Sequence, residues 1–108
     1  MTEPIEVFES SGNVFADLGF PDAEERYAKA MLSHLIAKAI TAHGLTQAQA
    51  AKRLGTTQPK VSAVVRGRLE GFSLDRLFRF LNALGMNVHV DVRPAGDEQT
   101  GHLLVSAS

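Results

Sequence analysis

Apolar residues recur at helical spacing through most of the chain after residue 21. The first such segment, Asp22–His43, carries a wide apolar stripe made of Ala28, Met31, Leu32, Leu35, Ile36, Ala39 and Ile40. A stripe of this kind is typical of a helix that packs one side on a core. Asp22 and Glu25 form an acidic variant of the capping box at its start, and Gly44 can end it. The pattern predicts a long scaffold helix.

Two shorter helical segments follow directly. The first begins at Thr46, which has Gln49 three residues later as in a capping box. It ends at Gly55, because glycine can take the left-handed conformation that closes a helix. The second begins at Thr57 and ends near Gly67. The sequence therefore predicts a pair of helices joined by a tight turn.

The second helix of this pair has two unlike sides. At about 100° per residue, one side carries Val61, Val64 and Val65, which predicts a core face. The other side is small, polar or basic and carries Pro59, Ser62, Ala63 and Arg66, with Gln58 at the tip and Lys60 on the flank. Between Thr46 and Arg68 there are five basic residues and no acidic one. This surface suits a polyanion.

A fourth helix and one strand are predicted toward the C-terminus. Ser73 caps a helix whose apolar positions are Leu74, Leu77, Phe78, Leu81 and Leu84, with Arg76 and Arg79 outside. In Met86–Val92 the period changes, because Val88, Val90 and Val92 alternate with His89 and Asp91. Alternation predicts a half-buried strand. A lone strand is unstable, so it must pair with the same strand of a second subunit or with part of the N-terminal arm.

The chain divides by composition into an N-terminal arm (1–20), a helical domain with the C-terminal strand (21–94) and a small, polar, mobile tail (95–108). The first 25 residues hold seven acids and no base, although the net charge is only −1. This acidic segment either meets a cationic protein or merely keeps the chain soluble. No run is long enough to cross a membrane and no signal peptide is evident, so a soluble, cytoplasmic protein is expected.

Catalytic and metal-binding patterns are missing from the sequence. There is no cysteine, and the four histidines are scattered along the chain, with no histidine pair at ligand spacing beside a carboxylate on one helix face. The glycines each close an element singly, so no phosphate-cradling loop is formed. We expect a protein that is not an enzyme and that needs neither metal nor cofactor.

The helix pair resembles the helix-turn-helix of the XRE family, which includes Cro and lambda-repressor-like proteins. Counting from Gln47, the resemblance is carried by alanine fifth, glycine ninth and aliphatic residues fifteenth and eighteenth: Ala51, Gly55, Val61 and Val64. It implies an all-α, five-helix lambda-repressor-like domain with one C-terminal β-strand, placed at a dimer interface. It also implies a dimer that reads a palindromic operator in double-stranded DNA.

Family roles carry over to individual positions of this chain. The base-contacting positions are Gln58, Pro59, Lys60, Ser62 and Ala63, where Pro59 and Ala63 replace residues that are often polar in the family. Gln47 and Thr57 match phosphate-contacting positions, and further charge for the phosphates comes from Lys52, Arg53, Arg66 and Arg68. The dimer strand carries Val88, Val90 and Val92.

A narrower resemblance extends beyond the helix pair. FADLGFPDAEE (15–25), GLTQAQAAKRLG (44–55) and RLFRFLNALGMNVHVDVRP (76–94) look like small XRE proteins that serve as HigA-type antitoxins. This implies a repressor of its own operon paired with a RelE-like toxin. The alternatives are a stand-alone XRE regulator without a toxin and a protein-interaction module that no longer binds DNA.

Overall fold

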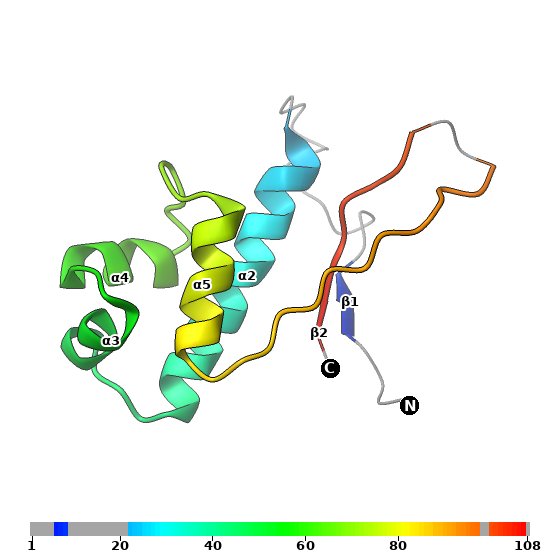
Figure 1. Ribbon diagram of the computed structural model, residues 1–108. Coiled ribbons are helices and arrows are strands. Elements are labelled where there is room, and N and C mark those ends of the chain that lie inside the picture. Colours follow the sequence, from blue (N-terminus) through cyan, green and yellow to red (C-terminus); the bar gives the residue numbers. More distant parts are fainter. Residues whose placement is uncertain (1–5, 9–21, 98–99, 108) are drawn as a thin grey trace. The chain divides into compact units, whose positions relative to one another are not determined.

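The computed structural model describes residues 6–8, 22–97 and 100–107. Their elements, in chain order, are β1 (Glu6–Phe8), α2 (Ala23–Ala42), α3 (Gln47–Leu54), α4 (Gln58–Val65), α5 (Leu74–Ala83) and β2 (Val105–Ala107) (Figure 1). The chain divides into two units, Leu32–His89 and the segments Met1–Met31 with Val90–Ser108. The boundary between the units falls within α2: residues 23–31 of this helix belong with the two ends of the chain, and residues 32–42 belong to Leu32–His89.

Helix α2 confirms the predicted long helix to within one residue at each end. At its start the Asp22 carboxylate accepts a hydrogen bond from Arg26 Nε at 2.8 Å, and Glu25 pairs with Lys29 at 3.1 Å. Both pairs have the i, i+4 spacing that places side chains on one helix face. The helix ends where Gly44 takes a φ of 65°, as expected for a glycine stop.

The helix pair has the caps that the sequence predicts. Thr46 Oγ1 accepts from Gln49 N at 3.1 Å, and Gln49 Oε1 accepts from Thr46 N at 2.9 Å, which completes the capping box of α3. Gly55 is left-handed, with φ 68° and ψ 34°. Thr57 then caps α4, because its hydroxyl accepts from Lys60 N at 3.4 Å. Three local signals thus fix where both helices begin and where the first one ends.

The core of the unit Leu32–His89 gathers apolar residues from all four helices. Its largest fully buried side chains are Ile36, Val61, Val64, Leu77 and Leu84. One buried polar group lies among them: Ser33 is 4% exposed and its hydroxyl donates to the Val64 carbonyl at 2.5 Å. This bond satisfies Ser33 and links α2 to the C-terminal part of α4, so the serine is compatible with a buried position.

The core face of α5 is rotated relative to the prediction. Leu77, Leu81 and Leu84 are buried as expected, but Phe78 is only half-buried. Phe80 takes the core position instead at 4% exposure, with its ring 6.3 Å from Phe72 in an edge-to-face arrangement. Phe72 lies before the helix and outside its periodicity. The aromatic pair therefore draws the core face of α5 toward Phe80, a contact that helical spacing alone does not reveal.

Two expectations about secondary structure are wrong. The described residues hold four helices, whereas five were expected. Met86–Val92 forms no strand in this single chain, and Val90 and Val92 are 75% and 87% exposed instead of half-buried. The physical reason is that a strand needs a partner for its backbone hydrogen bonds, and no described segment of the chain provides one. Pairing of Val88, Val90 and Val92 between two subunits stays a prediction.

A small sheet forms from the two ends of the chain. β1 pairs antiparallel with β2, with Glu6 opposite Ala107, Val7 opposite Ser106 and Phe8 opposite Val105. The arm therefore pairs with the segment 95–108, which was expected to be a mobile tail, and not with Met86–Val92. Residues 1–5 and 9–21, which make up most of the predicted arm, lie outside the described residues.

The tail also contacts the first turn of α2. The Glu24 carboxylate accepts from Leu103 N at 3.1 Å, and its second oxygen lies 2.5 Å from His102 Nδ1. The Leu103 amide, followed by the His102 ring, holds the pKa of Glu24 below its ordinary value. Because the pKa is lowered, the contact stabilises the docked tail above the ordinary glutamate pKa and is lost as the pH falls through the lowered value.

We therefore expect the Leu103 amide to lose protection on acidification below about pH 4.3, the ordinary pKa of a glutamate. Hydrogen exchange of this amide, followed by NMR between neutral and acidic pH, measures the effect. Glu24→Gln is the matched control, because the amide keeps the shape and cannot titrate. Protection that stays constant over this pH range in the wild type would contradict the assignment.

Candidate nucleic-acid interface

Helix α4 presents the N-terminal half of its predicted reading face to solvent. Gln58, Pro59 and Lys60 are exposed, whereas Ser62 and Ala63 are half-buried. The described residues therefore bring the first three predicted base contacts together at the start of the helix. Backbone amides in the first turn of a helix carry partial positive charge, so this end favours an anionic partner.

Buried valines hold this helix in place. Val61 and Val64 are each 1% exposed, as predicted, and Val65 is half-buried and so belongs only partly to the core face. Helices α3 and α4 pack together (Figure 1). Ala50 and Ala51 of α3 are buried, at 0% and 6% exposure. The turn at Gly55 and the valine anchors together turn the opposite side of α4 outward.

The remaining predicted phosphate contacts lie on α3 and at the two ends of α4. Gln47 is half-buried at the start of α3, Thr57 is exposed at the cap of α4, and the exposed cations are Lys52, Arg53, Arg66 and Arg68. Over Leu32–His89 the sequence has eight lysines and arginines against two acids, Glu70 and Asp75. Asp75 pairs with Arg79 at 2.9 Å. Excess positive charge on this unit is therefore available to a polyanion.

Arg53 makes an intramolecular contact that the sequence did not indicate. Its Nε donates to the Ala83 carbonyl at 2.9 Å, at the C-terminal end of α5. His43 Nε2 lies 2.7 Å from the neighbouring Leu84 carbonyl. Carbonyls at a helix C-terminus lack intrahelical donors, so basic side chains stabilise them. Arg53 thus has a role in joining α3 to α5 whether or not it also contacts phosphate.

Arg76 is a further residue whose placement differs from expectation. The sequence predicted it outside the core, yet it is half-buried, with its Nη2 3.3 Å from the Thr56 hydroxyl and its guanidinium over Phe72 and Phe80. A signal for the Phe80 contact was present in the sequence, because Phe80 lies four residues after Arg76 in α5, a spacing that places side chains on one side of a helix. Phe72 precedes the helix, so its contact with Arg76 had no such signal.

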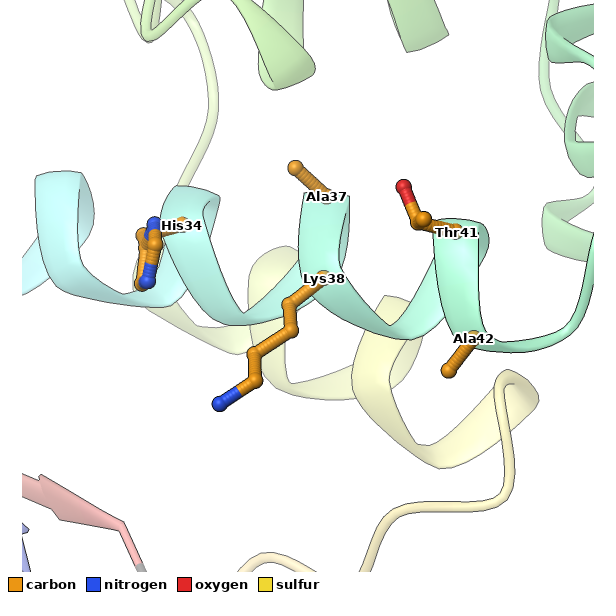
Figure 2. Close-up of a pocket in the computed structure, with 5 residues that line it drawn as sticks. All are labelled: His34, Ala37, Lys38, Thr41 and Ala42. Carbon is orange, nitrogen blue, oxygen red and sulfur yellow. The ribbon is translucent and has the colours of Figure 1, made fainter.

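A shallow hollow of about 470 Å³ runs along the exposed side of α2. Figure 2 shows its five lining residues, all from this helix: His34, Ala37, Lys38, Thr41 and Ala42. The lining holds no carboxylate. Over the part of the chain that the structure describes, no three histidine or acidic side chains are grouped as metal ligands. Within the same residues, no helix is long and apolar enough to span a membrane.

Comparison with known proteins agrees with the geometry of the helix pair. Residues 14–93 match a protein-family model described as "Helix-turn-helix domain". A solved structure named "Putative XRE Family Transcriptional Regulator" is 43% identical, with a TM-score of 0.74, and the match covers 82% of this chain and all of that one. This chain belongs to the XRE helix-turn-helix family. Among curated proteins, none matches. In this XRE protein, α3 and α4 are the two helices of the motif.

Proposed function

We propose that this XRE-family protein is a sequence-specific, DNA-binding transcriptional repressor without catalytic activity. The observation that carries the proposal is the start of α4, where Gln58, Pro59 and Lys60 are exposed on a helix held by two buried valines. A helix placed in this way can enter the major groove with its N-terminal side chains at the base edges. The net positive charge of the unit Leu32–His89 supports binding to the phosphate backbone.

Each group at the start of α4 has a defined task in this proposal. The Gln58 amide can donate to and accept from adenine in a bidentate pair, and Lys60 can reach guanine or a phosphate. Pro59 and Ala63 offer apolar contacts to thymine methyl groups in place of hydrogen bonds. Arg66 and Arg68, which are exposed after α4, contact phosphates and carry no sequence information.

We propose further that two copies read a palindrome. One helix pair covers few base pairs, and a dimer whose reading helices lie about 34 to 36 Å apart would contact two successive major grooves. The exposed valines Val90 and Val92, together with Val88, are available to pair with the same segment of a second copy. Burial of their apolar surface would favour such pairing.

The finer proposal is that the repressor is an antitoxin that regulates its own operon. It is supported by the three sequence segments that resemble HigA-type antitoxins and by the acidic first turn of α2, with Glu24 and Glu25. Isolation of the protein with a small basic toxin encoded in the adjoining reading frame would support this role. A gene with no toxin neighbour and no such co-purified protein would favour the stand-alone regulator.

Gln58→Ala tests the DNA-reading proposal. We expect it to weaken binding to the operator by about 1 to 3 kcal/mol while binding to random duplex changes little, because only a base contact is lost. Arg66→Ala is the contrasting variant. It should weaken binding to the operator and to random duplex equally, and it should reduce the slope of log K against log salt by about 0.9.

The measurement is fluorescence anisotropy with operator and random duplexes at two or more salt concentrations, with the operator taken from footprints upstream of the gene. Equal losses on both duplexes for Gln58→Ala would refute its role as a base contact. Wild-type protein without salt-dependent duplex affinity would overturn the proposed function and favour the interaction module, since counterion release makes such affinity fall steeply with salt.

A further inference from the structure

The guanidinium of Arg76 lies in an unusual environment beside the turn of the motif. Its Cζ is 5.1 Å from the ring centroid of Phe72 and 5.5 Å from that of Phe80, and both phenylalanines are buried. These distances are within the range of cation–π attraction. The same side chain donates from Nη2 to the Thr56 hydroxyl at 3.3 Å. Arg76 is therefore in contact with two aromatic rings and with one hydroxyl.

No carboxylate forms an ion pair with Arg76 within the described residues. Arg79 in the same helix behaves as an ordinary surface arginine, because its side chain is 76% exposed and pairs with Asp75. An exposed pair of this kind contributes little to stability. Arg76 and Arg79 lie in the same helix and carry the same charge, but their environments differ. Arg79 is therefore an internal reference for Arg76.

Thr56 occupies the point at which α3 gives way to α4. Its backbone N–H donates to the Ala51 carbonyl at 2.9 Å, which closes the end of α3 after the left-handed Gly55. The next residue, Thr57, is the N-cap of α4. Whatever fixes the Thr56 side chain therefore fixes the short connection that sets where α4 begins.

We propose that Arg76 is a positioning residue for the reading helix: it anchors the α3–α4 turn through Thr56 and thereby places Gln58 and Lys60 for base contact. The inference rests on the proposed function of the same site. Arg76 acts through Thr56, while the phenylalanines restrict its guanidinium to one orientation.

The expected consequence is a selective loss of operator binding. A turn held in the bound conformation avoids the entropic cost of ordering on binding, and base contacts need precise placement. Phosphate contacts tolerate small displacements because they are largely electrostatic. Loosening the turn should therefore weaken operator binding more than random-duplex binding.

Arg76→Gln and Thr56→Val test the inference from both ends of the hydrogen bond. We expect each to reduce operator affinity about five- to tenfold beyond any change on random duplex, the size expected for the loss of one intramolecular hydrogen bond of ordinary strength. The double variant should lose little more than either single one, because both remove the same contact. Arg79→Gln is the matched control, since it removes the same charge from the same helix.

Hydrogen exchange in the free protein gives a readout that is independent of DNA. The Lys60 amide, which donates to the Thr57 cap, should exchange faster in Arg76→Gln and Thr56→Val than in Arg79→Gln, while amides of α2 stay protected. If Arg76→Gln fails to fold, Thr56→Val still provides both measurements. An unchanged operator-to-random ratio in Thr56→Val, with wild-type protein that does discriminate, would overturn the inference and leave the proposed function intact.

Discussion

Replacing Lys52, Arg66 and Arg68 together by glutamine should lower the affinity for any duplex about a hundredfold near 0.1 M salt, if each contacts one phosphate. All three side chains are exposed, and no ion pair to an acid is formed by any of them within the described residues. Each phosphate contact releases condensed counterions when it forms. Losing three should reduce the slope of log K against log salt by about 2.7.

The matched control has the same change in charge at other positions. Lys38, Arg79 and Arg93 are exposed and are not among the predicted DNA contacts. Their joint replacement by glutamine should lower the affinity at most about tenfold, because no phosphate contact is predicted at these three positions. Titration of both triple variants with one duplex over a series of salt concentrations measures the loss of affinity in each variant. Equal losses would mean that net charge, and not this surface, governs binding.

The sequence predicted the helix-turn-helix well because its signals are local. A capping box, a left-handed glycine and a threonine cap each act within one turn of helix, so Thr46, Gly55 and Thr57 are sufficient to place α3 and α4. The core side of α4 followed from period alone, with Val61 and Val64 both buried. A capping or periodicity rule that involves only a few neighbouring residues can be applied without knowing how the rest of the chain folds.

Features that depend on distant partners were predicted less well. The alternation in Met86–Val92 is a genuine strand pattern, but alternation does not supply the partner that a strand requires. The observed strands, β1 and β2, are three residues each, too short for a period to be recognised. Their pairing joins positions about a hundred residues apart, as in Glu6 with Ala107. Long-range pairing of this kind leaves almost no trace in local sequence.

The arginines show the same limit at the candidate site. From its charge, Arg53 was predicted to contact phosphate and Arg76 to lie on the surface. A sequence gives the charge of a side chain but not the groups that surround it. In the structure Arg53 donates to the Ala83 carbonyl and Arg76 lies over two aromatic rings. Both tie α5 to the helix pair. The geometry of the reading helix thus depends in part on residues that composition would assign to the surface.

Leu77→Ala should destabilise the protein by about 2 to 5 kcal/mol, the cost of deleting a buried leucine side chain and leaving a cavity. Leu77 is 0% exposed in α5 and belongs to the core that also buries Val61 and Val64. Since native domains are stable by only about 5 to 15 kcal/mol, this single change should remove a large share of the total. Urea unfolding followed by circular dichroism measures the loss.

Leu104→Ala is the matched control, because the same atoms are removed from a side chain that is 52% exposed. We expect a change below about 0.5 kcal/mol there, as for most surface substitutions. Comparable losses at the two positions would contradict the packing of α5 in the core. If Leu77→Ala is destabilised as expected but still folded at low temperature, its operator affinity becomes informative: a core that only supports α4 should leave the operator-to-random ratio unchanged, whereas the turn variants at Thr56 and Arg76 should lower it.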